Sequence, residues 1–262
     1  MRLPVTWTDP PGGAPAGPPV LLVHGVGVGP TAFEPVAERL AGAGHRVGVV
    51  HRPGYGLAAG HLFTPLATQV AALSRLVDSL SAGPGVVLVG VSGGATLALL
   101  AAIARARTPV AGGAVTVVCH EPLVGPLAPD LHRRVTRAVG ELALGTGRFV
   151  RHLVGEATWA QLDANARATT VRRPDLVAAE ARAFARVAPT PGDLAAVRLD
   201  GGLVTTVGEH SGPERHRVAA VLARLSGSRV EVVTGAGHLA QVDAPDAFVA
   251  AILAAAPAEV LS

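Results

Sequence analysis

Six short valine-rich runs alternate with longer stretches of helical pattern, and this alternation constrains the fold more than any other feature of the chain. The runs are apolar on both faces, which is typical of strands in a parallel sheet covered on both sides. They cover residues 20–23, 47–50, 86–89, 115–118, 203–207 and 229–233. The helical stretches cover residues 31–41, 66–80, 95–106, 213–225 and 244–255. The alternation predicts an α/β fold with a doubly wound, mostly parallel sheet, and residues 3–8 predict an antiparallel edge strand.

One long segment departs from the alternation. Between Pro122 and Pro191 no convincing strand occurs, and helical patterns such as 130–144 and 175–187 take its place. A segment of this length and regularity is not a loop. It is best interpreted as a helical cap inserted over the carboxyl edge of the sheet, after the strand that ends near Glu121. The expected division is a core of residues 1–124 and 191–262 and a cap of residues 125–190.

Composition excludes several classes of function. Of the 262 residues, 49% are hydrophobic and 16% are charged, so the chain can bury a large core. All 22 basic residues are arginine, yet the net charge of +3 is too small for binding to a phosphate backbone. We therefore expect no nucleic-acid partner. The single cysteine, Cys119, excludes a disulfide framework and a multi-cysteine metal site, and its place on a valine-rich strand favours a structural role.

The distribution of charge bears on membranes and partners. Residues 79–104 carry no charge and would be long enough to span a membrane, but glycines break the stretch into short pieces. The N-terminus lacks the apolar core of a signal peptide. We expect a soluble, cytoplasmic protein with no membrane partner. Residues 125–195 hold ten arginines and seven acidic residues, whereas the remainder holds twelve of each. A solvated helical face would explain this excess, and an acidic carrier protein is the alternative.

The strongest chemical signal is the run Gly90-Val91-Ser92-Gly93-Gly94, which matches G-x-S-x-G. It directly follows a predicted strand and opens a predicted helix, which is the context that this motif requires. A sharp turn between strand and helix lifts the serine hydroxyl clear of the sheet. The helix N-terminus below it stabilises negative charge that develops during a reaction. The motif therefore indicates a nucleophilic serine.

With this motif the chain resembles the α/β-hydrolase fold family, of the serine hydrolase type with a helical cap. Residues 24–27 read His-Gly-Val-Gly at the end of the strand predicted over residues 20–23, where that family has its oxyanion turn. Residues 51–56 read His-Arg-Pro-Gly-Tyr-Gly, where the family usually has D-x-P-G-x-G. Residues 235–238 read Gly-Ala-Gly-His after the last strand, where the family places its catalytic histidine. The resemblance spans nearly the whole chain, and the serine precedes the histidine as the family requires.

The resemblance implies a role for each of these residues. Ser92 would be the nucleophile, and His238 the general base that takes its proton and later returns it to the leaving group. The oxyanion hole would consist of the backbone N–H groups of Val26 and Gly93. His24 resembles a structural histidine that shapes the oxyanion turn.

The third member of the triad departs from the commonest pattern of the family. The family usually has G-x-x-D after the strand at 203–207, but here Ser211 stands at the position of the aspartate. Some members, including haloalkane dehalogenases, place the acid after the preceding strand instead. By that pattern Glu121 is the main candidate, and Glu209 is the alternative because it lies close to the usual position. The third possibility is that neither serves and that Glu121 only anchors the cap.

Other acidic residues near strand ends fit less well. Asp200 precedes its strand and would face the opposite edge of the sheet, whereas Glu214 and Asp243 belong to the following helices. The sequence also lacks a phosphate loop, a dinucleotide fingerprint and an H-E-x-x-H motif, so we expect no cofactor and no metal.

These features predict a serine hydrolase that cleaves an ester, thioester or lactone through an acyl-enzyme. The substrate would be a small, largely apolar molecule, because caps of this kind usually form apolar pockets. Two alternatives stay open. The same triad could serve acyl transfer, cyclisation or carbon–carbon cleavage, or the chain could be a ligand-binding protein with a vestigial triad.

Overall fold

The structure is a computed structural model and describes residues 1–108, 112–127, 129–197, 199 and 201–256. In this part of the chain, seven strands form one sheet in the order β1-β3-β2-β4-β5-β6-β7. The strands are β1 (Val5–Thr8), β2 (Val20–Val23), β3 (Val47–Val50), β4 (Val86–Val91), β5 (Val115–His120), β6 (Leu203–Gly208) and β7 (Arg229–Val233). Only β1 runs antiparallel to its neighbour, and the other pairs are parallel. This arrangement confirms the predicted fold class and the antiparallel edge strand.

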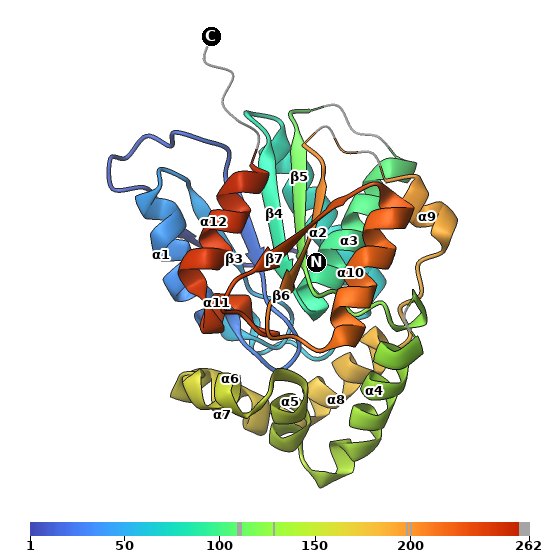
Figure 1. Cartoon of the computed structure of the whole chain (residues 1–262). Coiled ribbons are helices and arrows are strands. Elements are labelled where there is room, and N and C mark those ends of the chain that lie inside the picture. The colour runs from blue at the N-terminus through green and yellow to red at the C-terminus, as the bar shows by residue number, and fades with distance from the viewer. Residues whose placement is uncertain (109–111, 128, 198, 200, 257–262) are drawn as a thin grey trace.

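Helices cover both faces of the sheet (Figure 1). One face carries α1 (Glu34–Gly42), α11 (Ala240–Asp243) and α12 (Pro245–Ala255), and the other carries α2 (Leu66–Ser81), α3 (Gly93–Arg107) and α10 (Pro213–Ser226). The helix predicted over residues 31–41 begins at Glu34 instead, after a 3-10 turn over Pro30–Phe33. Pro35 explains this start, because a proline lacks an N–H group and fits only the first turn of an α-helix. None of the described helices is long and apolar enough to cross a membrane.

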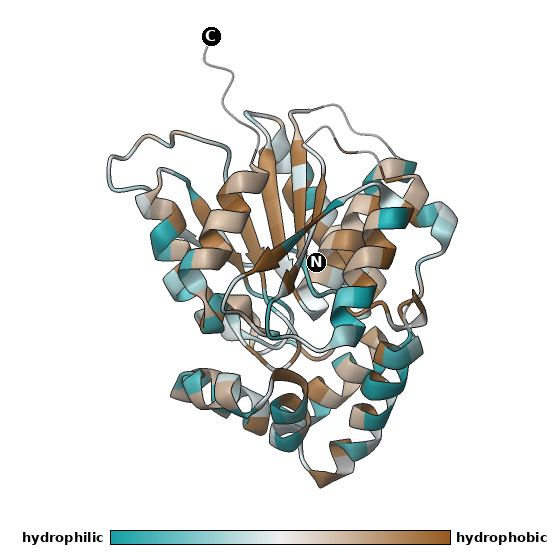
Figure 2. Ribbon diagram, in the orientation of Figure 1, coloured by the Kyte–Doolittle hydropathy of each residue, from teal (hydrophilic) through white to brown (hydrophobic). Residues whose placement is uncertain are grey.

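The core lies between these helices and the central strands. All residues of β2, β4, β5 and β6 are buried, and Figure 2 shows the middle of the sheet as predominantly hydrophobic. β7 is different, because Arg229, Val230 and Val232 are exposed. The prediction that this run is apolar and covered on both faces is therefore wrong for β7. It is the last strand of the sheet, so it has one neighbouring strand and less cover.

The register of the parallel strands brings three chain segments to one edge of the sheet. Val91 pairs with His120, and His120 pairs with Thr206, so β4, β5 and β6 end side by side. Gly208 at the end of β6 pairs with Val233 at the end of β7. The residues that follow these strands therefore lie close together, as they do in other open α/β sheets.

Between β5 and β6 the described chain is helical. After a 3-10 turn at Gly125–Leu127 come α4 (Pro129–Gly140), a second 3-10 turn (Glu141–Leu144), α5 (Thr146–Val154), α6 (Glu156–Gln161), α7 (Ala164–Arg172) and α8 (Pro174–Phe184). We call residues 129–184 the helical insert. Figure 1 shows it as a layer across one end of the sheet. A short helix, α9 (Pro191–Ala195), then leads back to the core.

Candidate active site

Ser92 lies in a sharp turn between β4 and α3. Its backbone has φ 56° and ψ −119°, in a region that L-residues rarely adopt. Two motif glycines make this turn possible. A Cβ at Gly94 would lie 2.0 Å from the carbonyl oxygen of Val23, and a Cβ at Gly90 would lie 2.4 Å from the carbonyl oxygen of Gly94. The backbone N–H of Ser92 donates to the carbonyl of His120 at 2.9 Å, which ties the turn to the end of β5.

The structure brings Ser92, His238 and Glu121 together in one hydrogen-bonded chain. His238, in the loop after β7, has its Nε2 at 3.0 Å from Ser92 Oγ and its Nδ1 at 2.7 Å from Glu121 Oε2. Relative exposure is 5% for Ser92, 5% for His238 and 3% for Glu121, so bulk water is largely excluded. With the proton on Nδ1, the imidazole donates to the carboxylate and accepts from the serine hydroxyl. That is the geometry of a serine nucleophile with its base and orienting acid.

Glu121 is fixed at both carboxylate oxygens. Its Oε1 accepts from the backbone N–H of Gly208 at 3.0 Å, and its Oε2 lies 3.1 Å from Nε of Arg215 as well as against His238. The backbone of Glu121 has φ 49°, an unusual value for a residue with a side chain, and its N–H donates to the carbonyl of Thr206 at 3.1 Å. A strained backbone that its surroundings hold in place is common where a side chain must take one orientation.

Charges around the site set the protonation states of the pair. Burial by itself would raise the pKa of Glu121, but the Arg215 guanidinium and the hydrogen bond from His238 lower that pKa below its usual range. Burial and the positive charge of Arg215 together lower the pKa of His238 to about 4, against the opposing effect of Glu121. At neutral pH the glutamate is therefore ionised and the histidine is neutral, the states required for a general base and its orienting acid.

The lowered pKa of His238 predicts an acid-tolerant rate profile. A base works only when unprotonated, so kcat/KM should fall as the pH drops through the pKa of the free enzyme. With that pKa at about 4, kcat/KM should stay flat from pH 8 to below pH 6. The measurement is kcat/KM for one neutral ester between pH 3.5 and 8, with circular dichroism at each pH as a folding control. A half-maximal rate at pH 6.5 or above would contradict this assignment.

The other acidic residues considered for the triad contact groups other than His238 or lie outside the described residues. Glu209 is exposed, and its Oε2 accepts from the backbone N–H of Gly235 at 2.8 Å, so the structure does not bring it to His238. Asp243 accepts from Gly237 N–H and from the hydroxyl of Thr158. Glu214 forms an ion pair with Arg134, and Asp200 lies outside the described residues.

The oxyanion turn packs directly on the nucleophile. A Cβ at Gly25 would lie 3.1 Å from Cβ of Ser92, and a Cβ at Gly93 would lie 3.2 Å from Cγ2 of Val26. The predicted donors, Val26 and Gly93, are therefore neighbours beside Ser92. His24 is fully buried, and its Nδ1 lies 3.0 Å from the carbonyl oxygen of Gly25. Burial lowers the pKa of His24 well below its usual range, so the ring is neutral.

The helical insert holds this turn through a buried network that sequence analysis does not identify. Glu180 of α8 forms a buried ion pair with Arg52 and accepts from the Tyr55 hydroxyl at 2.5 Å. Arg52 donates to the carbonyl oxygens of His24 and Gly25, and the Tyr55 oxygen accepts from the backbone N–H of Gly27 at 2.9 Å. The hydroxyl of Thr170, on α7, donates to the carbonyl oxygen of Gly27. Packing of the insert and the position of the oxyanion turn are therefore coupled.

This network provides a stability test. Replacing Glu180 with glutamine leaves the Arg52 guanidinium buried without its counter-charge, so the free energy of unfolding should fall by about 3 kcal/mol. The matched control is Glu156→Gln, which removes an exposed partner of Arg151 and should cost less than about 1 kcal/mol. Urea unfolding of both variants checks this expectation. Equal costs for the two substitutions would show that the network does not anchor the insert.

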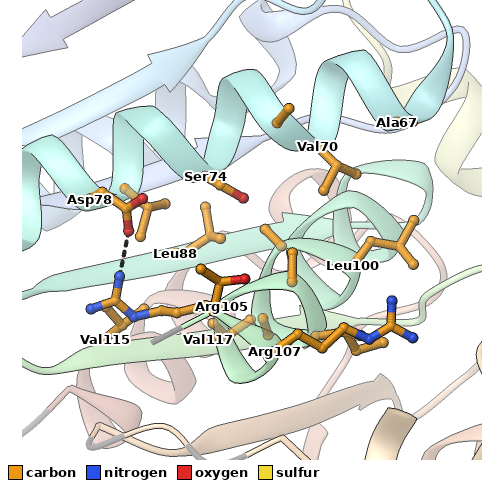
Figure 3. Close-up of a pocket in the computed structure, with 17 residues that line it drawn as sticks. Ala67, Val70, Ser74, Asp78, Leu88, Leu100, Arg105, Arg107, Val115 and Val117 are labelled. Carbon is orange, nitrogen blue, oxygen red and sulfur yellow. Dashed lines mark hydrogen bonds and ion pairs between the residues drawn. The ribbon is translucent and has the colours of Figure 1, made fainter. Parts of the chain in front are cut away.

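One cavity of the described structure lies away from this site. It has a volume of ≈ 610 Å³ and lies between α2 and α3, where Val70, Leu88 and Leu100 line it and the Asp78–Arg105 ion pair lies at one end (Figure 3).

Over the nucleophile, the Phe184 ring of α8 lies 3.0 Å from the position that a Cβ at Gly93 would take. The insert thus covers Ser92 closely.

Two further residues with reactive side chains, Cys119 and His120, are buried on β5. Cys119 is buried on β5, and burial raises the pKa of its thiol to about 12, which keeps it protonated. The Nδ1 of His120 lies 3.0 Å from the Thr206 hydroxyl, and its Nε2 lies 3.3 Å from the carbonyl oxygen of Gly237. No group of three or more histidine, cysteine or acidic side chains in the described part of the chain could hold a metal ion.

Comparisons with known proteins agree with this fold. A model of the alpha/beta hydrolase family matches residues 20–251. A comparison with curated protein sequences gives no match. Among solved structures, a lipase-esterase related protein from Clostridium acetobutylicum ATCC 824 has a TM-score of 0.76 at 12% identity, over 97% of this chain and 99% of that one. A thermophilic esterase from Thermogutta terrifontis has a TM-score of 0.71 at 20% identity, with 96% and 92% covered. The enol-lactonase from Burkholderia xenovorans LB400 has a TM-score of 0.64 at 15% identity, with 97% and 95% covered.

Proposed function

The chain belongs to the alpha/beta hydrolase family, and from that premise we propose that it is a serine hydrolase that cleaves a carboxylic ester, thioester or lactone. One observation carries the proposal. The Ser92 hydroxyl, the His238 imidazole and the Glu121 carboxylate form a continuous hydrogen-bonded chain, at 3.0 and 2.7 Å, in a buried site. The lipase-esterase related protein, the thermophilic esterase and the enol-lactonase, which have a similar fold, are consistent with this reaction class.

The proposed reaction proceeds in two halves. Ser92 Oγ attacks the carbonyl carbon while its proton moves to Nε2 of His238, and Glu121 stabilises the imidazolium that forms. The backbone N–H groups of Val26 and Gly93 would bind the negatively charged oxygen of the tetrahedral intermediate. His238 then gives the proton to the leaving alkoxide or thiolate, which leaves an acyl-serine ester. His238 then takes a proton from a water molecule that attacks the acyl carbon, and it returns this proton to Ser92 Oγ as the carboxylic acid is released.

We also propose a role for the predicted cap, residues 125–190, in selecting the substrate. Phe184 lies over the oxyanion turn, and Leu153 and Val154 line a cavity that reaches His238. Phe184 and Val26 both lie against Gly93, beside the nucleophile, and these apolar side chains favour a small ester with an apolar acyl or alkyl group.

Product analysis in H₂¹⁸O tests the reaction type. Purified protein is incubated with a panel of short-chain esters, thioesters and lactones, and the acid product is examined by mass spectrometry. A hydrolase places one ¹⁸O atom in that acid when a lactone or an ester is opened through its acyl carbon. Acyl transfer or cyclisation would give products without that oxygen, whereas carbon–carbon cleavage would give products in which the ester, thioester or lactone bond is intact. A vestigial triad would give no product above the rate of the Ser92→Ala variant.

A further inference from the structure

A second cavity lies against His238, on the side of the triad acid. It has a volume of ≈ 390 Å³ and lies between α5 and α6 of the helical insert and the loops that follow β6 and β7. Its lining includes Leu153, Ser211, Arg215 and His238, together with Arg134 of α4. One histidine thus joins this cavity to the nucleophile, because His238 Nε2 lies 3.0 Å from Ser92 Oγ. A group bound in the cavity would lie close to the reacting atoms.

Hydrogen-bond donors without partners are concentrated among the residues that line this cavity. Seven buried side-chain nitrogen or oxygen atoms of the described residues have no hydrogen-bond partner. Four of the seven belong to residues that line the cavity: Nε of Arg134, Oγ of Ser211, and Nη1 and Nη2 of Arg215. Buried polar atoms in folded proteins are almost always paired, since an unpaired one costs free energy. A cluster of four donors therefore indicates a ligand that accepts hydrogen bonds.

Arg215 is the centre of the cluster. It is 4% exposed, and its Nε lies 3.1 Å from Oε2 of Glu121, which leaves both terminal nitrogens of the fork free of protein partners. Ser211 stands four residues earlier in the sequence and lines the same cavity, and its hydroxyl also lacks a hydrogen-bond partner. A serine carries no negative charge, so it cannot serve as a counter-ion for Arg215.

The charges favour a carboxylate over a phosphate or a carbonyl group. Glu121 pairs with Arg215 and Glu214 pairs with Arg134, and Glu156 and Asp243 line the cavity. These carboxylates would repel a dianion such as phosphate more strongly than a singly charged carboxylate. A neutral carbonyl oxygen has only two lone pairs for four donors. A carboxylate has about four lone-pair sites and a planar shape that matches the guanidinium fork.

We infer that this cavity is a subsite for a carboxylate group of the substrate, held by Arg215, Ser211 and Arg134 beside His238. The inference rests on the proposed function and narrows its substrate class to esters, thioesters or lactones that also carry a free carboxylate. The rest of the substrate contacts the apolar lining, such as Leu153. The product of cleavage by attack at the acyl carbon would then be a dicarboxylic acid or a hydroxy acid.

Binding to the Ser92→Ala protein tests the subsite without turnover. Isothermal titration compares monoethyl glutarate, which carries one carboxylate, with diethyl glutarate, which carries none. The monoester should bind at least about tenfold more tightly, as expected for charge-assisted hydrogen bonds. Adding Ser211→Asp places a carboxylate of the protein against Arg215 and should bring that preference to about onefold or below.

Two arginine variants on α4 distinguish loss of the subsite from a general defect in folding. Arg134→Gln, in the Ser92→Ala background, should reduce the preference for the monoester by roughly threefold or more. Arg133→Gln removes the same charge from the neighbouring residue, which is exposed and pairs with Asp130, and should leave the preference unchanged. Circular dichroism confirms that each protein is folded.

The outcomes separate this inference from the proposed function. Equal affinity for the two esters, or an equal effect of the two arginine variants, would overturn the subsite even if wild-type protein hydrolyses esters. Selective binding of the monoester that is lost with Ser211→Asp would support the subsite, even if wild-type protein hydrolyses neither ester. Hydrolysis of monoethyl glutarate by the wild type in preference to diethyl glutarate would support both.

Discussion

Ser92→Ala is expected to abolish turnover while the protein stays folded. The variant lacks the only atom that could form the acyl-enzyme at this turn, and loss of a triad nucleophile costs on the order of a millionfold in kcat. Folding should survive, because the serine hydroxyl contacts His238 and is not part of the packing that the motif glycines require. The measurement is kcat for the best ester of the panel, with thermal unfolding as a check on structure.

A second serine variant serves as its control. Ser79→Ala removes an exposed hydroxyl from α2 that donates only to the carbonyl oxygen of Leu76. It should keep the wild-type rate. If Ser92→Ala also kept a rate within about tenfold of the wild type, the nucleophile would lie elsewhere.

Glu121→Gln is expected to cause a second large loss of activity. Glu121→Gln keeps the shape of the side chain but removes the charge that stabilises the His238 imidazolium, and it offers an amide where the histidine tautomer needs an acceptor. The rate should fall roughly 10⁴-fold, by analogy with the aspartate-to-asparagine change in a serine protease triad. The measurement is kcat/KM for one ester, with urea unfolding to detect any loss of stability caused by the unpaired Arg215.

Glu209→Gln is the matched control, because it makes the same chemical change at the alternative acid. Its carboxylate accepts from Gly235 N–H, in the loop that leads to His238, so we expect a loss of less than about tenfold. The reverse ranking of the two variants would move the acid to Glu209. Two near-normal rates would mean that Ser92 and His238 act as a dyad.

The sequence predicts the sheet well because its signals are local. Valine-rich runs buried on both faces, separated by helical stretches, leave few topologies other than a doubly wound parallel sheet. β7 is where this reasoning fails. Its valines resemble those of the central strands, but Arg229 and Glu231 interrupt the run, and the exposure of Val230 and Val232 depends on the place of β7 at the edge of the sheet. The predicted start of α1 is wrong by a few residues, because a sequence encodes the ends of a helix less strongly than it encodes the presence of the helix.

The candidate site could be predicted in part for the same reason. Ser92 and His238 stand in short motifs at strand ends, and the parallel register brings such ends to one edge. The absence of an aspartate at position 211 and the place of Glu121 at the end of β5 make Glu121 the main candidate for the acid, with Glu209 as the alternative. The structure places these three residues in contact.

Residues that support the site could not be predicted. Arg52 and Glu180 lie 128 positions apart, and their ion pair depends on how α8 packs against the core. Arg215 lies within an ordinary helical pattern, and only the fold shows that its guanidinium meets Glu121. Such contacts depend on tertiary packing, which the local periodicity of a sequence does not encode.

Covalent labelling shows whether Ser92 is an activated nucleophile. Wild-type protein and the Ser92→Ala variant are treated with a fluorophosphonate, digested and mapped by mass spectrometry. The account predicts one phosphonyl adduct per chain, located on the peptide that contains Ser92, and none on the variant. It also predicts much slower labelling of His238→Ala, because the serine then lacks its base. An unlabelled wild-type protein, or an adduct on another residue with Ser92 unmodified, would contradict the assignment of Ser92 as an activated nucleophile.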